Sequence, residues 1–139
     1  MSGAPGIRDY ALEQMNHLLT RLAFQIHRAA KVPGPDEIHD VRVSIRRFWQ
    51  GLLLFGDFFP PWEVKKVRRR LKRMLKLTSE IRDRDITLDF LARLKQTRHR
   101  PGLVKKRLAL QKEFSQMVQR WNARDFSARW RSGLSLRNT

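Results

Sequence analysis

The sequence predicts an all-α fold in which four long helices form one antiparallel bundle. Apolar residues recur every three or four positions along most of the 139-residue chain, as they do in amphipathic helices. The strict alternation of apolar and polar residues that indicates β-strands is not visible. Breaks rich in proline and glycine separate the periodic stretches, and short connections favour antiparallel neighbours. The length fits a single domain, residues 1–139, that is large enough to bury a core.

The first two helices are expected at about residues 7–31 and 37–55. The apolar stripe of the first contains Leu12, Met15, Leu19, Leu22, Ile26 and Ala29. The stripe of the second contains Val41, Ile45, Phe48, Leu52 and Phe55. Between them, Pro33-Gly34-Pro35 interrupts the pattern, because proline does not continue a helix. Asp36 follows directly and is expected to be the N-cap of the second helix.

The third helix is expected to begin near Trp62, after the aromatic and proline-rich segment GDFFPPW. Its apolar stripe drifts in register near residues 78–83, so we expect either a kink or two separate helices there. Arg100-Pro101-Gly102 is expected to break the chain before a fourth helix at about 103–123. The remaining residues predict one short helix and a frayed terminus. The packed core is therefore expected to cover about 7–124, and 125–139 to form a tail.

The dominant feature of the composition is its positive charge. Thirty lysines and arginines oppose thirteen aspartates and glutamates, which gives a formal net charge of +17. Such an excess causes self-repulsion, so it indicates a polyanionic partner such as nucleic acid, an anionic membrane or a phosphate chain. The longest apolar run, 52–55, is far too short to span a membrane. The absence of cysteine excludes disulfides and thiol chemistry, and fits a reducing, cytoplasmic compartment.

Two of the expected helices carry basic faces beside their apolar stripes. In IHDVRVSIRRF, the spacing places His39, Arg42 and Arg46 on one face, with Arg47 on its shoulder. VKKVRRRLKRMLK, residues 64–76, contains eight basic residues and no acid. Its main row consists of Lys65, Arg69, Lys72 and Lys76. Cations in such a row lie roughly 5 Å apart, which suits an extended anion. One basic helix is usually a solvated face, but two consecutive ones favour a binding surface.

The acidic residues of SEIRDRDITLDFL, 79–91, have two interpretations, as metal ligands or as ion-pair partners. Glu80 and Asp89 each precede an arginine by four residues, which is the spacing of helical ion pairs. We therefore favour structural ion pairing, with Asp83 or Asp85 holding an arginine in place. No catalytic triad, Gly-rich phosphate loop or zinc motif is present, so no cofactor, metal or catalytic residue is expected.

The two basic segments and the acidic one resemble the motifs of CHAD domains, the conserved histidine α-helical domains. The first motif is matched by His39, Arg42, Val43, Arg46 and Arg47, followed by the apolar run 52–55. The second is an Arg-Asp-x-Asp followed by an aliphatic residue, and is matched by Arg82, Asp83, Asp85 and Ile86. The similarity is strongest over residues 36–95.

The resemblance implies a helical domain that binds inorganic polyphosphate through a basic surface, and an association with polyphosphate granules. The binding positions that it implies are His39, Arg42, Arg46, Arg47, Lys65, Arg69, Lys72, Arg73, Lys76 and Arg82. Arg129 and Arg131 are expected to lie outside this site. Because an adjacent phosphate favours a protonated imidazole, His39 should make binding tighten from about pH 8 to pH 6.

Typical CHAD domains are about twice as long and place two similar four-helix bundles around a basic groove. This chain resembles the first bundle, so it is either a short form or part of a longer protein. A homodimer is expected to rebuild the groove, with Trp121, Phe126 and Trp130 at the interface.

Two other functions remain open. The first alternative is a helical nucleic-acid-binding protein, in which Trp49 or the loop 58–62 stacks on bases. The absence of helix-turn-helix spacing is evidence against base recognition. The second is an enzyme that processes phosphate chains.

Overall fold

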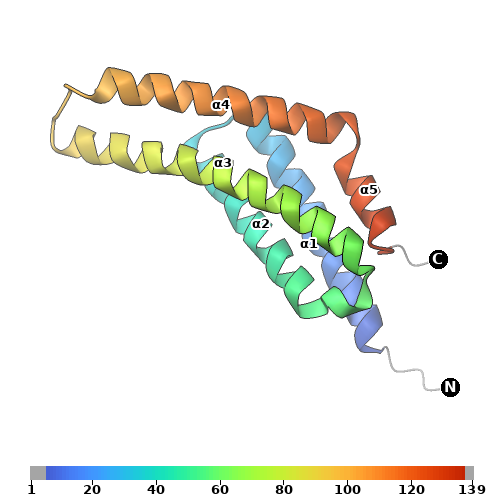
Figure 1. Ribbon diagram of the computed structural model, residues 1–139. Coiled ribbons are helices and arrows are strands. Elements are labelled where there is room, and N and C mark those ends of the chain that lie inside the picture. The colour runs from blue at the N-terminus through green and yellow to red at the C-terminus, as the bar shows by residue number, and fades with distance from the viewer. Residues whose placement is uncertain (1–5, 137–139) are drawn as a thin grey trace.

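The computed structural model describes residues 6–136, and all secondary structure in that part of the chain is helical. The elements are α1 (Ile7–Lys31), α2 (Pro35–Phe55), the short 3-10 helix η1 (Gly56–Phe58), α3 (Pro61–Arg93), α4 (Arg100–Ala123) and α5 (Phe126–Gly133). In Figure 1, the long α3–α4 hairpin lies across the α1–α2 pair, and α5 turns back at the end of α4. The predicted all-α bundle is confirmed.

Two helices begin earlier than the sequence suggests, because proline starts a helix as readily as it ends one. Gly34 is the N-cap of α2 and Pro35 is its first residue, so Asp36 lies in the first turn and is not the cap. Pro101 likewise lies in the first turn of α4, which begins at Arg100. The break that was expected at 100–102 therefore falls at residues 94–99.

The third helix is continuous across residues 78–83, so of the two alternatives the structure has a single helix and not two. The stripe is hard to follow in the sequence because the fully buried position 78 is a threonine. Thr78 Oγ1 donates a hydrogen bond to the carbonyl of Met74 at 2.8 Å, which satisfies the hydroxyl inside the core. In Figure 1, the C-terminal part of α3 projects beyond α2, and Leu94, which follows this helix, is exposed.

The C-terminal segment belongs to the core and does not form a tail. Trp130 of α5 stacks on Phe48 of α2 with 6.0 Å between ring centroids, and contacts Trp121 edge-on at 5.2 Å. Leu134 and Leu136 are fully buried. The core therefore continues to Leu136, beyond the boundary near residue 124 that the sequence suggested. Residues 137–139 of the expected tail lie outside the described part of the chain.

The aromatic residues that were expected at a dimer interface are buried inside their own chain. Trp121 and Trp130 are 6% exposed, and Phe126 is 7% exposed. These three aromatic residues pack against one another in the core, so they are not available to a second copy. None of the helices between residues 6 and 136 combines the length and hydropathy needed to cross a bilayer.

Candidate anion-binding surface

His39, Arg42 and Arg46 of the first motif lie along the line where α2 packs against α3, which we call the α2–α3 seam. The two helices are antiparallel, so early residues of α2 meet late residues of α3. Arg82 Nη1 lies 2.8 Å from His39 Nδ1, and Arg42 Nη2 donates to Ser79 Oγ at 2.9 Å. The seam therefore joins residues from both motifs, although they are about 40 positions apart in the sequence.

Arg42 is the buried cation of the seam. It is only 8% exposed, and its Nε is buried without a hydrogen-bond partner. Burial lowers the pKa of Arg42 from its ordinary value, and the nearby charges of Arg46 and Arg82 lower it further, while Asp83 acts in the opposite direction. An arginine stays protonated under such conditions, so the seam holds a desolvated charge beside two like charges. A bound anion would offset this unfavourable electrostatic energy.

His39 serves as an acceptor within the seam. Arginine carries only donors, so the contact between Arg82 and His39 requires an unprotonated Nδ1 on the imidazole. This contact is made by the tautomer of His39 that carries its proton on Nε2. In this form His39 holds the Arg82 guanidinium in position at the exposed edge of the seam.

Arg46 and Arg47 are neighbours in the sequence but point to different sides of α2. Arg46 lines a shallow pocket of about 250 Å³ at the seam, together with Trp49, Gln50 and Leu75. Arg47 follows Asp40 by two helical turns, and Asp40 forms an ion pair with Arg28 of α1 at 3.1 Å. Arg47 therefore lies toward the α1 side of α2, away from the seam cluster.

The basic residues of α3 cover its whole outer surface. Arg68 lies at the seam, with its guanidinium 5.4 Å from the ring centroid of Trp49. The exposed residues Lys65, Arg69, Lys72 and Lys76 form the ridge of the helix, which we call the α3 crest. Arg70 and Arg73 lie on the opposite side from Arg68 and line pockets shared with α4. Of the α3 residues that the sequence predicted to bind the anion, four therefore form the crest, and Arg73 lies on the side that faces α4.

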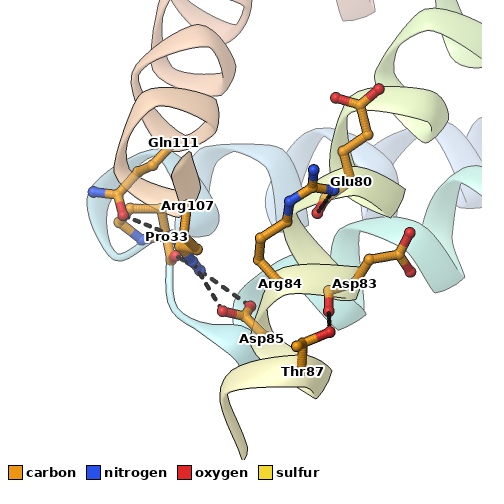
Figure 2. Close-up of polar contacts among 8 residues, drawn as sticks. All are labelled: Pro33, Glu80, Asp83, Arg84, Asp85, Thr87, Arg107 and Gln111. Carbon is orange, nitrogen blue, oxygen red and sulfur yellow. Dashed lines mark hydrogen bonds and ion pairs between the residues drawn. The ribbon is translucent and has the colours of Figure 1, made fainter. Parts of the chain in front are cut away.

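Asp85 of the second motif fastens three parts of the fold together (Figure 2). It accepts hydrogen bonds from Arg107 Nε at 2.9 Å and Nη2 at 3.2 Å. The same guanidinium donates to the carbonyl of Pro33 at 2.8 Å and to Gln111 Oε1 at 2.6 Å. Asp85 therefore connects α3 to α4 and, through Arg107, to the loop between α1 and α2.

The other acidic residues of the motif region have separate contacts. Asp89 pairs with Arg93 at 3.1 Å, as the four-residue spacing predicts. The expected Glu80–Arg84 ion pair is replaced by a hydrogen bond from Arg84 Nη1 to the backbone carbonyl of Glu80, at 3.3 Å. The Asp83 carbonyl accepts a hydrogen bond from Thr87 Oγ1 at 2.8 Å.

A comparison with models of protein families identifies the same family as the two motifs. The model of the CHAD domain matches residues 10–137, which is nearly the whole chain. The chain belongs to the CHAD family. The family is associated in general with polyphosphate binding, and its members are non-catalytic helical domains in general. Neither the curated proteins nor the solved structures that were compared gave a match.

Two features of this CHAD domain were missed by sequence reasoning. Arg107 occupies a core position of α4, between the apolar residues Leu103 and Leu110. An arginine inside an apolar stripe is a usable signal for a buried ion pair, because an isolated buried charge is very costly. The second feature is the pair Arg120 and Arg124, which line a pocket together with Arg70 and Arg73 of α3. They gave no such signal in the sequence, since they lie on an exposed face whose neighbours depend on how α4 packs. Within residues 6–136, no group of His, Cys, Asp and Glu side chains is arranged to hold a metal ion.

Proposed function

We propose that this CHAD domain binds inorganic polyphosphate through the α2–α3 seam and the α3 crest, without catalysis. The observation that supports this most directly is the clustering of Arg46 and Arg82 beside the buried Arg42, whose pKa is lowered first by burial and then by these two neighbouring charges. Such an arrangement is unfavourable without an anion. A domain with this ligand is also expected at polyphosphate granules in the cytoplasm.

The α3 crest supplies the second part of the proposed surface. Its lysines and arginine are exposed and follow one another at helical spacing, so their charges lie roughly 5 Å apart along the helix. A linear phosphate chain carries a negative charge on every unit and can follow such a row. A small metabolite would contact only one or two of these cations.

Parallel titrations with long-chain polyphosphate, heparin and duplex DNA, at equal anion charge and two salt concentrations, test the proposal. We expect polyphosphate to bind most tightly, and its affinity to fall steeply with salt because counterions are released. The preference for polyphosphate should persist at the higher salt concentration. Equal affinity for all three polyanions would contradict a specific site, and release of orthophosphate would contradict the absence of catalysis.

Nucleic-acid binding is the alternative that one surface feature favours. Trp62 is 64% exposed, and the Nζ of Lys66 lies 5.6 Å from the centroid of its ring, so this aromatic residue could stack on a base. The other aromatic candidates are less accessible. Phe59 is 4% exposed, and Trp49 is partly buried against the core with Arg68 above it.

The role of His39 gives a pH prediction. Histidine is the side chain whose charge most commonly changes near neutral pH. Protonation of Nδ1 would remove the acceptor that holds Arg82, and would turn the imidazole into a second cation facing the ligand. Polyphosphate binding should therefore tighten as the pH falls from about pH 8 to pH 6, and His39→Ala should flatten the dependence. Calorimetric titrations at pH 6, 7 and 8 would measure it, and an unchanged profile in the variant would refute this role.

Assembly of two chains around one polyphosphate molecule also remains a prediction. The aromatic residues near the C-terminus cannot form the interface, because they are buried in their own bundle. Each chain carries a formal charge of +17, so apposed basic surfaces would repel one another without the ligand. Any two-fold pair should therefore depend on polyphosphate as the bridging group.

A further inference from the structure

A second basic surface lies on the other side of α3 from the seam. Three neighbouring pockets, of about 420, 340 and 410 Å³, lie between α3, α4 and α5. The first two share Arg70 and Arg124, and the last two share Arg73 and Met117. We call this surface the α3–α4 groove. Its cationic lining consists mainly of Lys66, Arg70, Arg73, Arg120, Arg124 and Arg129.

The arginines of this groove lack acidic partners. Among the described residues, ion pairs involve Arg28, Arg93, Arg107 and Lys66, and none involves an arginine of the groove. Glu80 and Glu113 line the third pocket, and Glu63 lines the first. The groove therefore holds more positive than negative charge, and its pockets bring together arginines that are about 50 positions apart in the sequence, such as Arg70 and Arg120. As at the seam, the electrostatic energy of gathering these positive charges is unfavourable unless an anion binds.

The groove is separate from the seam because of the geometry of α3. Arg68 contacts Trp49 at the seam, and Arg70 lines the groove. Two residues along a helix correspond to a rotation of about 200°, so these side chains leave α3 in nearly opposite directions. A ligand at the seam cannot contact the groove unless it passes over the α3 crest, whose cations connect the two surfaces.

Glu63 of α3 and Gly133 of α5 meet at the end of the groove near α5. Gly133 of α5 lies so near the side chain of Glu63 that a Cβ at this position would be 2.5 Å from Glu63 Oε2. The Glu63 carboxylate is also 3.7 Å from Lys66 Nζ. This acidic group at the end of the pocket would repel a phosphate chain that continued past it. The first pocket is therefore suited to the terminus of a chain, with Arg70, Arg124 and Arg129 around it.

We propose that the α3–α4 groove is a second binding track for a linear phosphate chain, and that the pocket beside α5 receives the end of that chain. This inference rests on the proposed polyphosphate-binding function. A long chain crosses the α3 crest and occupies the seam and the groove together, whereas a short chain occupies only one of them. Linking the two tracks in one ligand raises affinity through effective concentration. Long chains should therefore bind more tightly, per phosphate, than tripolyphosphate.

Tryptophan signals can locate the ligand directly. The chain has four tryptophans, of which Trp49 lies at the seam while Trp121 and Trp130 line the pocket beside α5. We expect long-chain polyphosphate to shift the indole N–H resonances of Trp49, Trp121 and Trp130 in a ¹⁵N-labelled protein. Tryptophan-to-phenylalanine variants would assign the signals. Shifts confined to Trp49 would overturn the second track.

Affinity measurements on the full chain complete the test. Arg120→Glu with Arg124→Glu should lower the affinity for long-chain polyphosphate by about tenfold, and should remove the shifts of Trp121 and Trp130. The matched control is Arg8→Glu with Arg21→Glu, a pair of exposed arginines on α1. If the glutamate variant fails to fold by circular dichroism, Arg120→Gln with Arg124→Gln replaces it.

The experiments distinguish a groove that does not bind polyphosphate from a protein that does not bind polyphosphate at all. If the groove variant binds like the control, while changes at the seam weaken binding, the second track is absent and the proposed function stands. If the wild-type protein does not bind polyphosphate, both proposals fail. A loss of affinity in the groove variant that adds to the loss from seam changes supports two tracks, because independent contacts contribute additively to the binding free energy.

Discussion

Polyphosphate binding should weaken about 100-fold when Arg46 and Arg82 are both changed to glutamate. Each arginine is expected to make a charge-assisted hydrogen bond to phosphate, which contributes about 1.5–3 kcal/mol. At the lower value for each contact, losing both corresponds to about two orders of magnitude in the dissociation constant. Arg46 is exposed, and the side-chain hydrogen bond of Arg82 is made to His39, so the fold should tolerate both changes. Calorimetric titration with long-chain polyphosphate would measure the loss.

The control for this experiment must change the net charge by the same amount at positions outside the proposed binding surface. Arg8→Glu with Arg21→Glu meets this requirement, because both residues are exposed on α1, which packs mainly against α2. Arg131 is unsuitable, since it donates hydrogen bonds to Asn16 Oδ1 at 3.0 Å and to Thr20 Oγ1 at 3.2 Å. Arg129 is unsuitable because it lines the α3–α4 groove. Equal losses in the seam variant and the α1 control would mean diffuse attraction with no defined site.

The second large effect is on stability. Asp85→Ala should lower the free energy of unfolding by about 3 kcal/mol, because it leaves the Arg107 guanidinium without its carboxylate partner. The two side chains are 16% and 10% exposed, so water cannot replace the lost contact efficiently. The substitution also loosens the connection between α3, α4 and the carbonyl of Pro33. Urea unfolding followed by circular dichroism would measure the change.

Asp89→Ala is the matched control for Asp85→Ala. Asp89 also pairs with an arginine, at 3.1 Å, but these two side chains are 65% and 77% exposed. Surface ion pairs of this kind typically contribute between 0 and about 1 kcal/mol, so the control should change stability little. Similar losses for the two variants would contradict a special structural role for Asp85. Folded Asp85→Ala protein should retain polyphosphate affinity, since Asp85 points away from the seam toward α4.

The helices of this protein could be predicted from the sequence because their signals are local. The apolar stripe from Leu12 to Ala29 lies on one side of α1, and the same holds for Val41 to Phe55 in α2. Helix boundaries were less certain, because Pro35 and Pro101 are compatible with either a break or a first turn. The C-terminal segment was misjudged, because the burial of Trp130 and Leu136 depends on contacts with α1 and α2.

By itself, the sequence determined the helical fold, the family and the basic faces of α2 and α3, since each follows from residue types at short spacing. The tertiary structure decided which cations meet. The crossing of α2 and α3 pairs His39 with Arg82 and directs Arg47 away from them. The packing of α4 and α5 against α3 brings Arg70, Arg124 and Arg129 to one pocket. Helical periodicity specifies the face on which a residue lies, but only the packing of one helix on another specifies what that face contacts.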